Sequence, residues 1–488
     1  MNESSLSQTA LNGVLWASVE KFGGRMIQFI STVVLARILV PEDFGTIAMI
    51  MIIFAIANTL TDSGFSQALI REEKITESDR STTFYVNFAI AFLLFIIIWF
   101  SAPYISEFYG KPILCDITRF MALTPIFYSL TIVQRAHYIH KINFRTQAYI
   151  NLLASTLSGA TAIYCAILGF GVWALAVQYV VLAFVNSVLY WIANPWVPKK
   201  FLDKESFDRL FGFGSKLMMS GILSVTFNQI YKVIIGKMYS ANLLGFYSQA
   251  ENIKNAISEN LSGIVTKVNY PALSKVKNDK KRLEDAYKKI IKFTSYLLFP
   301  SMLGLILVAE PLVLTLIGEK WLESVPIIKL LAFSGLVYHL QVINLDMLKV
   351  LGRSDLFLRL EIIKKVGVAL AIVIGLKFGF WGLILAQVIS SYVSLFINMS
   401  YTSKIMKYSR LQQIQDIMPV FFLTLPMVLA VYLMDLIEYS VPVFRLSALV
   451  LVGVVVYFGL SYILKPPSFK DAIYLLRPKL KFLKYFKV

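Results

Sequence analysis

Long apolar stretches, separated by short charged or turn-forming segments, fill this chain from end to end. A stretch of about 18 or more apolar residues is long enough to cross a membrane as a helix. The pattern predicts about fourteen such spans, which makes the chain an all-α polytopic membrane protein. Their approximate ranges are 12–39, 44–69, 82–108, 113–140, 146–169, 171–194, 207–238, 244–271, 288–317, 322–350, 355–377, 380–403, 416–437 and 442–464.

Composition supports this class. Of the 488 residues, 57% are hydrophobic and 16% charged, whereas soluble domains carry about 25% charged residues. The formal charge of +18 would suit nucleic acid, but no nucleic-acid-binding signature accompanies it. The two cysteines are too few for a disulfide framework, and the three histidines show no metal-ligand spacing. No metal or cofactor is expected.

The chain contains an internal repeat, visible as matching segments in the same order. VVLARILVPEDFGTIA, from Val33, aligns with VIIGKMYSANLLGFYS, from Val233, and FGVWAL, from Phe170, aligns with FGFWGL, from Phe378. The aligned pairs are Gly45 with Gly245, Arg37 with Lys237, Pro103 with Pro311, Gly110 with Gly318, Tyr128 with Tyr338, and Trp173 with Trp381.

Each repeat holds six spans, and an even number gives both halves the same orientation in the membrane. The prediction is therefore two parallel six-helix repeats plus two C-terminal helices. The predicted domains are an N-terminal lobe at 1–200, a C-terminal lobe at 201–410, two added spans at 411–465 and a basic tail at 466–488.

The distribution of Lys and Arg predicts the orientation, because cytoplasmic loops are enriched in these residues. Basic segments at 71–80, at 274–292 and from Lys465 onward fall on one side of the predicted membrane, and the opposite loops are short and nearly uncharged. Both termini are therefore expected in the cytoplasm.

The first predicted span carries charges at mid-depth, where a charged side chain costs about 2.5–3.5 kcal/mol on insertion scales. Lys21, Arg25 and Gln28 recur at steps of three and four together with Ser18 and Thr32, so they share one helix face. A single polar stripe on an apolar helix predicts a water-filled cavity. The alternative is that Lys21 and Arg25 pair with Glu20 or a neighbouring carboxylate and lock helices together.

The corresponding spans of the second half are also polar, and we expect these helices to line a cleft between the halves, where parallel-repeat transporters bind substrate. Cations there suit an anionic cargo such as a lipid pyrophosphate or an acidic glycan. The expected substrate-binding residues are Lys21, Arg25, Gln28, Asn228, Lys232, Asn252, Lys254 and Asn255.

Four acidic residues, Glu20, Asp62, Glu251 and Glu259, lie on the same polar spans. They are candidates to bind a coupling H+ or Na+. The alternative for each is a structural ion pair with a nearby cation.

The N-terminal phrase LWASVEKFGGRMIQFISTVVLARILVPEDFGTIAM, followed by DSGFSQALIR at 62–71, carries a family resemblance. With fourteen spans and two six-span halves, it resembles the multidrug/oligosaccharidyl-lipid/polysaccharide exporter superfamily. Within that superfamily it resembles the Wzx-type lipid-linked oligosaccharide flippases, particularly the colanic-acid and teichuronic-acid types. The resemblance covers roughly residues 8–465.

This resemblance implies a V-shaped pair of lobes that work by alternating access. It implies transfer of undecaprenyl-pyrophosphate-linked oligosaccharide across a bacterial inner membrane, for lipopolysaccharide O-antigen, capsule or exopolysaccharide. Membrane lipids and the lipid-linked oligosaccharide are then its partners, and nucleic acid is not. In related lipid II flippases the last two spans form a groove for the lipid tail.

Two other functions compete with the flippase. An ion-coupled antiporter for drugs or organic cations, from the same superfamily, would need an acidic cavity; Asp62, Glu251 and Glu259 keep that alternative open. A membrane enzyme that polymerises or ligates glycans would need a large external loop or a catalytic His/Arg cluster, and every predicted external loop is short. The prediction is a transporter and not an enzyme.

Overall fold

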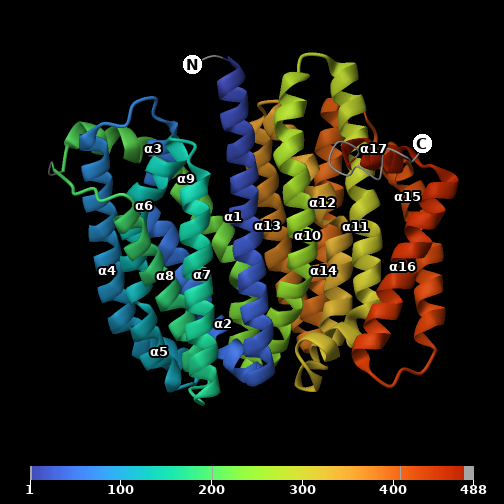
Figure 1. Cartoon of the computed structure of the whole chain (residues 1–488), viewed down its shortest axis with the longest axis horizontal. Helices are drawn as coiled ribbons and strands as arrows, with labels where there is room; N and C mark the ends of the chain where they lie inside the picture. Colours follow the sequence, from blue (N-terminus) through green and yellow to red (C-terminus); the bar gives the residue numbers. More distant parts are fainter. Residues whose placement is uncertain (1–2, 200–201, 407, 477–488) are drawn as a thin grey trace. The chain divides into compact units, whose positions relative to one another are not determined.

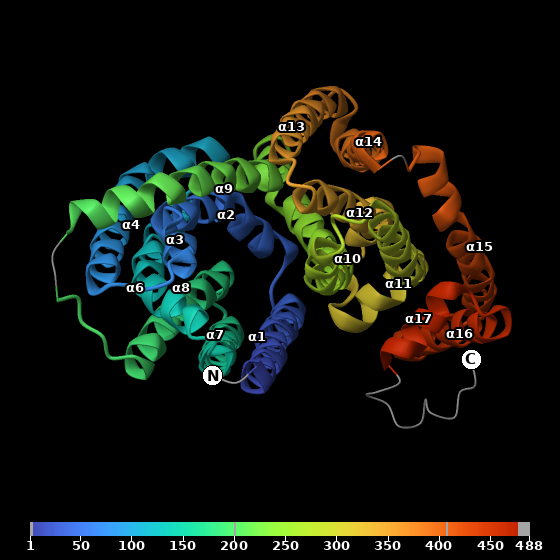
Figure 2. The same cartoon turned by 90° about the horizontal axis from the view of Figure 1, so that it is seen from above.

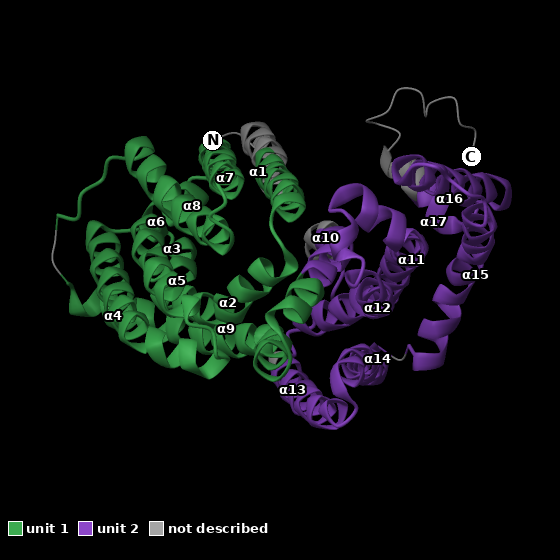
Figure 3. Cartoon of the chain, turned by 90° about the horizontal axis from the view of Figure 1, so that it is seen from below, with its two compact units in different colours: residues 1–248 green, residues 249–488 purple. Residues whose placement is uncertain are grey.

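The computed structural model describes residues 3–199, 202–406 and 408–476, and within these ranges the regular elements are helices (Figure 1). Two compact units divide the chain, Met1–Ser248 and Gln249–Val488 (Figure 3). Unit 1 contains α1 (Glu3–Ile38), α2 (Pro41–Asp62), α3 (Phe65–Arg71), α4 (Glu77–Tyr109), α5 (Ile113–Met121), α6 (Leu123–His140), α7 (Phe144–Ile167), α8 (Val172–Ala193) and α9 (Lys204–Met238).

The next helix, α10 (Ala241–Lys275), begins in unit 1 and continues into unit 2. The remaining elements belong to unit 2. They are α11 (Lys280–Leu316), the 3₁₀ helix η1 (Glu319–Trp321), α12 (Ser324–Val350), α13 (Ser354–Leu376), α14 (Gly379–Met406), α15 (Arg410–Asp435), α16 (Pro442–Leu464) and α17 (Pro467–Leu476).

Every predicted span coincides with a helix or with two consecutive helices, which confirms the predicted fold class. Eleven helical segments among the described residues are long and apolar enough to cross a membrane. The other three predicted spans correspond to α1, α10 and α13, which are 36, 35 and 23 residues long. These three helices are long enough, since about 20 residues suffice to span a bilayer. They are too polar or too charged to be identified as membrane spans by hydropathy.

Two predicted spans contain breaks. The span predicted at 44–69 divides into α2 and α3, because Ser63 and Gly64 both adopt positive φ angles of 48° and 73°. Such backbone angles end an α-helix and favour glycine. The span predicted at 113–140 divides into α5 and α6 at Ala122.

Helix α9 starts the second sequence repeat, yet it packs along α2 within unit 1. Three glycines allow the close approach: a Cβ atom at Gly214 would lie 2.7 Å from the carbonyl oxygen of Ser63, one at Gly221 would lie 3.0 Å from Thr59, and one at Gly236 would lie 3.0 Å from Met49. Small residues let membrane helices bring their backbones together.

Two residues of the segment between α8 and α9 are hydrogen-bonded to the start of α4. The indole nitrogen of Trp196 donates to Glu77 Oε1 over 2.7 Å, and the backbone nitrogen of Asp203 donates to Thr82 Oγ1 over 3.0 Å. Arg209 pairs with Asp79, which is fully buried, and also with Glu72. The start of α9 is therefore attached to α4 and to the segment before it at several points.

The predicted domain boundaries at 200, 410 and 465 rest on the sequence repeat, and they stay a prediction together with the V-shaped pairing of lobes. The compact units group α9 and the start of α10 with the first 200 residues. The last residues of the predicted tail, 477–488, lie outside the described residues.

The starts of α2 and α10 meet through residues that the repeat aligns with one another, all within unit 1. A Cβ atom at Gly45 would overlap the carbonyl oxygen of Ala241, and one at Gly245 would overlap the carbonyl oxygen of Pro41. The contact is reciprocal, as in a two-fold symmetric interface, where residue i touches j and j touches i. Only a residue without a side chain fits at either position.

In unit 2, the two C-terminal helices are tied to α11. The Tyr296 hydroxyl donates to Ser461 Oγ over 2.9 Å, and the Tyr457 hydroxyl donates to the carbonyl oxygen of Tyr296 over 2.7 Å. Near one end of the helices, Lys292 pairs with Asp416 at 2.7 Å. Further along the helices, Met427 and Leu449 pack in one apolar cluster with Met302 of α11, so the pair α15–α16 is an integral part of unit 2.

We expect Gly45→Ala and Gly245→Ala each to lower thermal stability, because a methyl group would collide with backbone atoms that cannot rotate away. Overpacking of this kind costs about 1–3 kcal/mol. Thermal unfolding of the purified protein in detergent measures the effect. Gly304→Ala is the matched control, since its Cβ would have no neighbour within 4 Å. Equal melting temperatures for all three variants would contradict the close contact.

Candidate functional site

Two of the predicted substrate-binding residues of α1, Arg25 and Gln28, lie on the side of the helix that α7 leaves uncovered. Glu20 and Gly23 face α7, where they meet Asn151 and Leu152, and Figure 2 shows the two helices side by side. Arg25 and Gln28 point elsewhere and are exposed. The side chains of Lys21 and of Ser18 lie outside the described part of the structure.

The other predicted substrate-binding residues fall in both units. In unit 1, Asn228 is exposed and Lys232 is half-buried on α9. In unit 2, Asn252 is exposed, whereas Lys254 and Asn255 are half-buried on α10. The Lys254 stem lies on α12, with its Cδ atom 3.5 Å from the position a Cβ would take at Gly335.

The structure brings two of the predicted acidic residues together around an arginine that the sequence analysis missed. Arg135 of α6 interacts electrostatically with Glu20 of α1 and Asp62 of α2. Asn151 donates to Glu20 Oε1 over 2.5 Å, and the backbone nitrogen of Ser66 donates to Asp62 Oδ1 over 3.1 Å. We call Glu20, Asp62, Tyr128, Arg135 and Asn151 the Arg135 cluster.

Tyr128 belongs to this cluster because it interacts with both Asp62 and Arg135. Its counterpart in the repeat, Tyr338 of α12, interacts with Glu259 of α10 in unit 2. Each unit therefore places a carboxylate of a polar helix beside the tyrosine that the repeat aligns. Unit 2 has no matching arginine, since Leu345 stands seven residues after Tyr338, as Arg135 stands after Tyr128.

Glu251, the fourth predicted acidic residue, is buried in unit 2 with 9% of its surface exposed. Among the described residues, no group of three or more His, Cys, Asp or Glu side chains could hold a metal ion. The acidic residues that come together, Glu20 and Asp62, are grouped with Tyr128 and Arg135.

A signal for Arg135 was present in the sequence. Tyr128 and Arg135 are seven residues apart, which places them on one helix face. Arg135 was overlooked because it lies in the segment QRAHYIHK, near the end of a span. Several basic residues and histidines at such a position are typical of a cytoplasmic border.

The Arg135 cluster contains one guanidinium and two carboxylates. Arginine stays protonated in proteins, whereas a carboxylate can take up a proton or bind a small cation. Glu20 and Asp62 are therefore the two groups of the cluster whose charge can change.

The family described as "Polysaccharide biosynthesis protein" matches residues 34–326, which is more than half of the chain. The chain belongs to this family. The match runs from the end of α1 to the start of α12, so it includes Asp62, Arg135 and the α2–α9 packing.

Two relatives are similar in sequence over a larger part of the chain. The chain is 26% identical to "Teichuronic acid biosynthesis protein TuaB" of Bacillus subtilis over 72% of this chain and 73% of that one. It is 23% identical to "Lipopolysaccharide biosynthesis protein WzxC" of Escherichia coli over 89% of each chain.

The solved structure of "Lipid II flippase MurJ, inward closed conformation" matches with a TM-score of 0.77 and 18% identity, over 94% of this chain and all of that one. At 18% identity, this match shows that the two chains share a fold. The predicted polysaccharide family is confirmed by the family match and the relatives, and the solved structure confirms the fold that was expected with it.

We expect a double-mutant cycle between Arg135→Gln and Asp62→Asn to show coupling of roughly 0.5–3 kcal/mol, as found for residues of one interaction network. Removing the arginine takes away its attraction to Asp62, and that loss has no further cost once Asp62 is also neutral. The measurement is thermal or denaturant unfolding of the four proteins in detergent. The control cycle pairs Arg135→Gln with Glu205→Gln, an exposed residue of α9, and additive effects in both cycles would contradict the cluster.

Proposed function

We propose that this membrane protein is a flippase that moves undecaprenyl-pyrophosphate-linked oligosaccharide units across the bacterial inner membrane, for assembly of a surface polysaccharide. The observation that carries the proposal is the family match over 34–326. The relatives named for teichuronic acid and lipopolysaccharide biosynthesis support the same class of cargo.

The proposed mechanism is alternating access, with cations that attract the pyrophosphate or acidic sugars. Arg25 is exposed on a membrane helix, and its planar guanidinium suits bidentate contacts with phosphate oxygens. Lys21, Lys232 and Lys254 add positive charge on the same class of polar helix. Gln28, Asn228, Asn252 and Asn255 supply amide groups for sugar hydroxyls.

The Arg135 cluster supports a second part of the proposal, which is coupling to an ion. In this proposal Glu20 or Asp62 takes up H+ or Na+ and thereby weakens its attraction to Arg135. The same ion changes the attraction between α1, α2 and α6, since each helix contributes one charged group. Binding the ion thus favours one packing of these helices over another.

The rival function is an antiporter for organic cations, and the acidic residues of the Arg135 cluster do not favour it. Glu20 and Asp62 both interact with Arg135, so a cationic drug would have to compete with a guanidinium. The family match is with polysaccharide biosynthesis proteins. We propose a transporter without catalytic residues, with both termini in the cytoplasm, as the distribution of basic residues predicts.

The test of the flippase is transfer of a lipid-pyrophosphate-linked oligosaccharide across liposomes that contain the purified protein. We expect the wild-type protein to expose the sugar to a membrane-impermeant glycosidase, and Lys21→Ala/Arg25→Ala to lower the rate of exposure at least about tenfold, which is about 1.4 kcal/mol. The two lost cations are the proposed contacts for the pyrophosphate.

The matched control is Lys281→Ala/Arg282→Ala, which removes two exposed cations near the start of α11. We expect this variant to retain the wild-type rate. Equal transfer by both double variants would keep the flippase and remove the role of Lys21 and Arg25. Absence of transfer with several glycans, accompanied by uptake of an organic cation, would favour the antiporter.

A second experiment tests ion coupling in the same liposomes. We expect an imposed H+ or Na+ gradient to accelerate transfer by the wild-type protein, and Glu20→Gln or Asp62→Asn to abolish that acceleration, because a neutral side chain has no charge for the ion to offset. Glu73→Gln, in an exposed loop segment, is the control and should respond like wild type. If neither gradient affects wild-type transfer, the coupling role of the cluster is wrong.

A further inference from the structure

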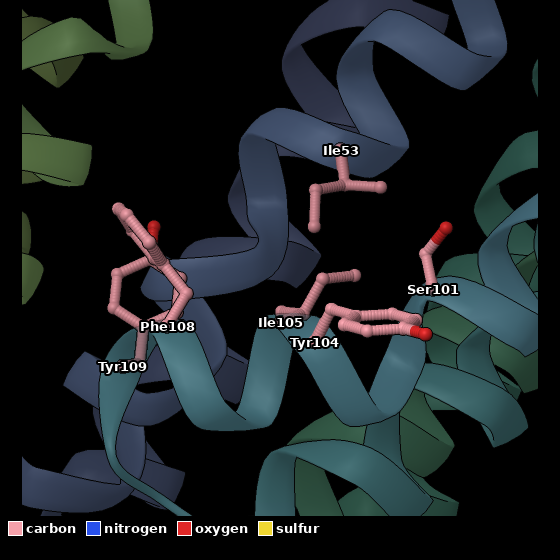
Figure 4. Close-up of a pocket in the computed structure, with 6 residues that line it drawn as sticks. All are labelled: Ile53, Ser101, Tyr104, Ile105, Phe108 and Tyr109. Atoms are coloured by element: carbon pink, nitrogen blue, oxygen red, sulfur yellow. The ribbon is translucent and has the colours of Figure 1, made fainter.

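An apolar pocket opens on unit 1 between α2 and α4, and none of the polar residues discussed above lines it (Figure 4). Its volume is about 310 Å³. In Figure 4, Ile53 projects from α2 towards Ile105 and Tyr104 of α4, with Phe108 to one side. The six lining residues are Ile53, Ser101, Tyr104, Ile105, Phe108 and Tyr109.

The pocket faces the surroundings of unit 1. The side chains of Tyr104 and Phe108 are 73% and 46% exposed, so they form an open groove and not an enclosed cavity. Both helices belong to segments apolar enough to cross a membrane, Pro41–Arg71 and Glu77–Tyr109. The surroundings of such a groove are therefore lipid chains.

The groove runs along the last two turns of α4. From Ser101 to Phe108 it covers roughly 10 Å, at about 1.5 Å per residue of helix. Phe108 lies next to the end of the span, and Ser101 lies deeper in it. An extended hydrocarbon chain that enters from the membrane surface follows the same direction.

A cation stands at the outer end of this groove. The Nζ atom of Lys237, in the last turn of α9, lies 4.5 Å from the centroid of the Phe108 ring and donates to the carbonyl oxygen of Phe108. The end of α9 is held there because Gly236 packs against Met49 and Tyr109. An ammonium group has three N–H donors, so further donors remain for an anion.

We propose that this groove binds one acyl chain of an anionic phospholipid, whose phosphate contacts Lys237. An apolar groove that ends in a fixed cation is complementary to a lipid with a hydrocarbon chain and an anionic head group. A pocket of about 310 Å³ is at the small end of ligand sites, so it accepts part of one chain. The site is separate from the proposed substrate-binding residues.

The test uses the full-length protein in nanodiscs of phosphatidylcholine that contain a small fraction of phosphatidylglycerol with a photoactivatable group in one acyl chain. After illumination, mass spectrometry locates the modified peptides. We expect labelling within 101–109 in the wild-type protein. Lys237→Ala should reduce it about fivefold, which corresponds to about 1 kcal/mol per basic residue near an anionic lipid.

Two further variants separate the groove from the charge. Ile53→Trp fills the groove and should reduce labelling while Lys237 remains in place, and Lys237→Arg should restore it. The matched controls are Lys377→Ala, an exposed lysine of unit 2, and Leu93→Trp, whose side chain is 56% exposed on the same helix α4. Both should label like wild type.

Three results would overturn the proposal. One is equal labelling by photoactivatable phosphatidylcholine, which would show a groove that accepts any lipid chain. Another is undiminished labelling in both Lys237→Ala and Ile53→Trp. The third is displacement of the phosphatidylglycerol probe by a polyprenyl phosphate at lower concentration, which would assign the groove to an isoprenoid carrier.

Discussion

The architecture of unit 1 depends on a backbone contact without side chains, at Gly45 and Gly245. There the starts of α2 and α10 approach so closely that a Cβ atom at either glycine would overlap a carbonyl oxygen of the other helix. Because only two residues separate the end of α9 from the start of α10, this contact also holds the end of α9 beside α2. The remaining length of α9 follows α2 through Gly236, Gly221 and Gly214.

Much of the fold could be predicted from the sequence, because helix length and apolar composition are properties of continuous segments. The repeat was equally visible, and the alignment of Gly45 with Gly245 is now explained by their contact. Which helices become neighbours could not be predicted in this way. A repeat shows which residues are equivalent, whereas the packing of α9 on α2 depends on glycines whose role is visible only when both helices are present.

The Arg135 cluster also depends on which helices become neighbours, so it could be predicted only in part. The sequence identified Glu20 and Asp62 as unusual, since each lies on a span with a polar face. It missed Arg135, because a basic residue near a span end is ordinary when the partner helices are unknown. The backbone break at Ser63 and Gly64 was missed for a similar reason: the apolar pattern continues across it, and its cause is local conformation.

The placement of α9 has a consequence for biosynthesis. A membrane protein is made from its N-terminus, and its domains generally fold as units during synthesis. Unit 1 extends to Ser248, so the first eight helices emerge before the one that covers α2. Until α9 follows, the surface of α2 around Met49 and Thr59 lacks the helix that covers it in the finished protein. In the finished protein the segment before α9 is bonded to α4 through Trp196 and Asp203, so the attachment point of the arriving helix lies on helices made earlier.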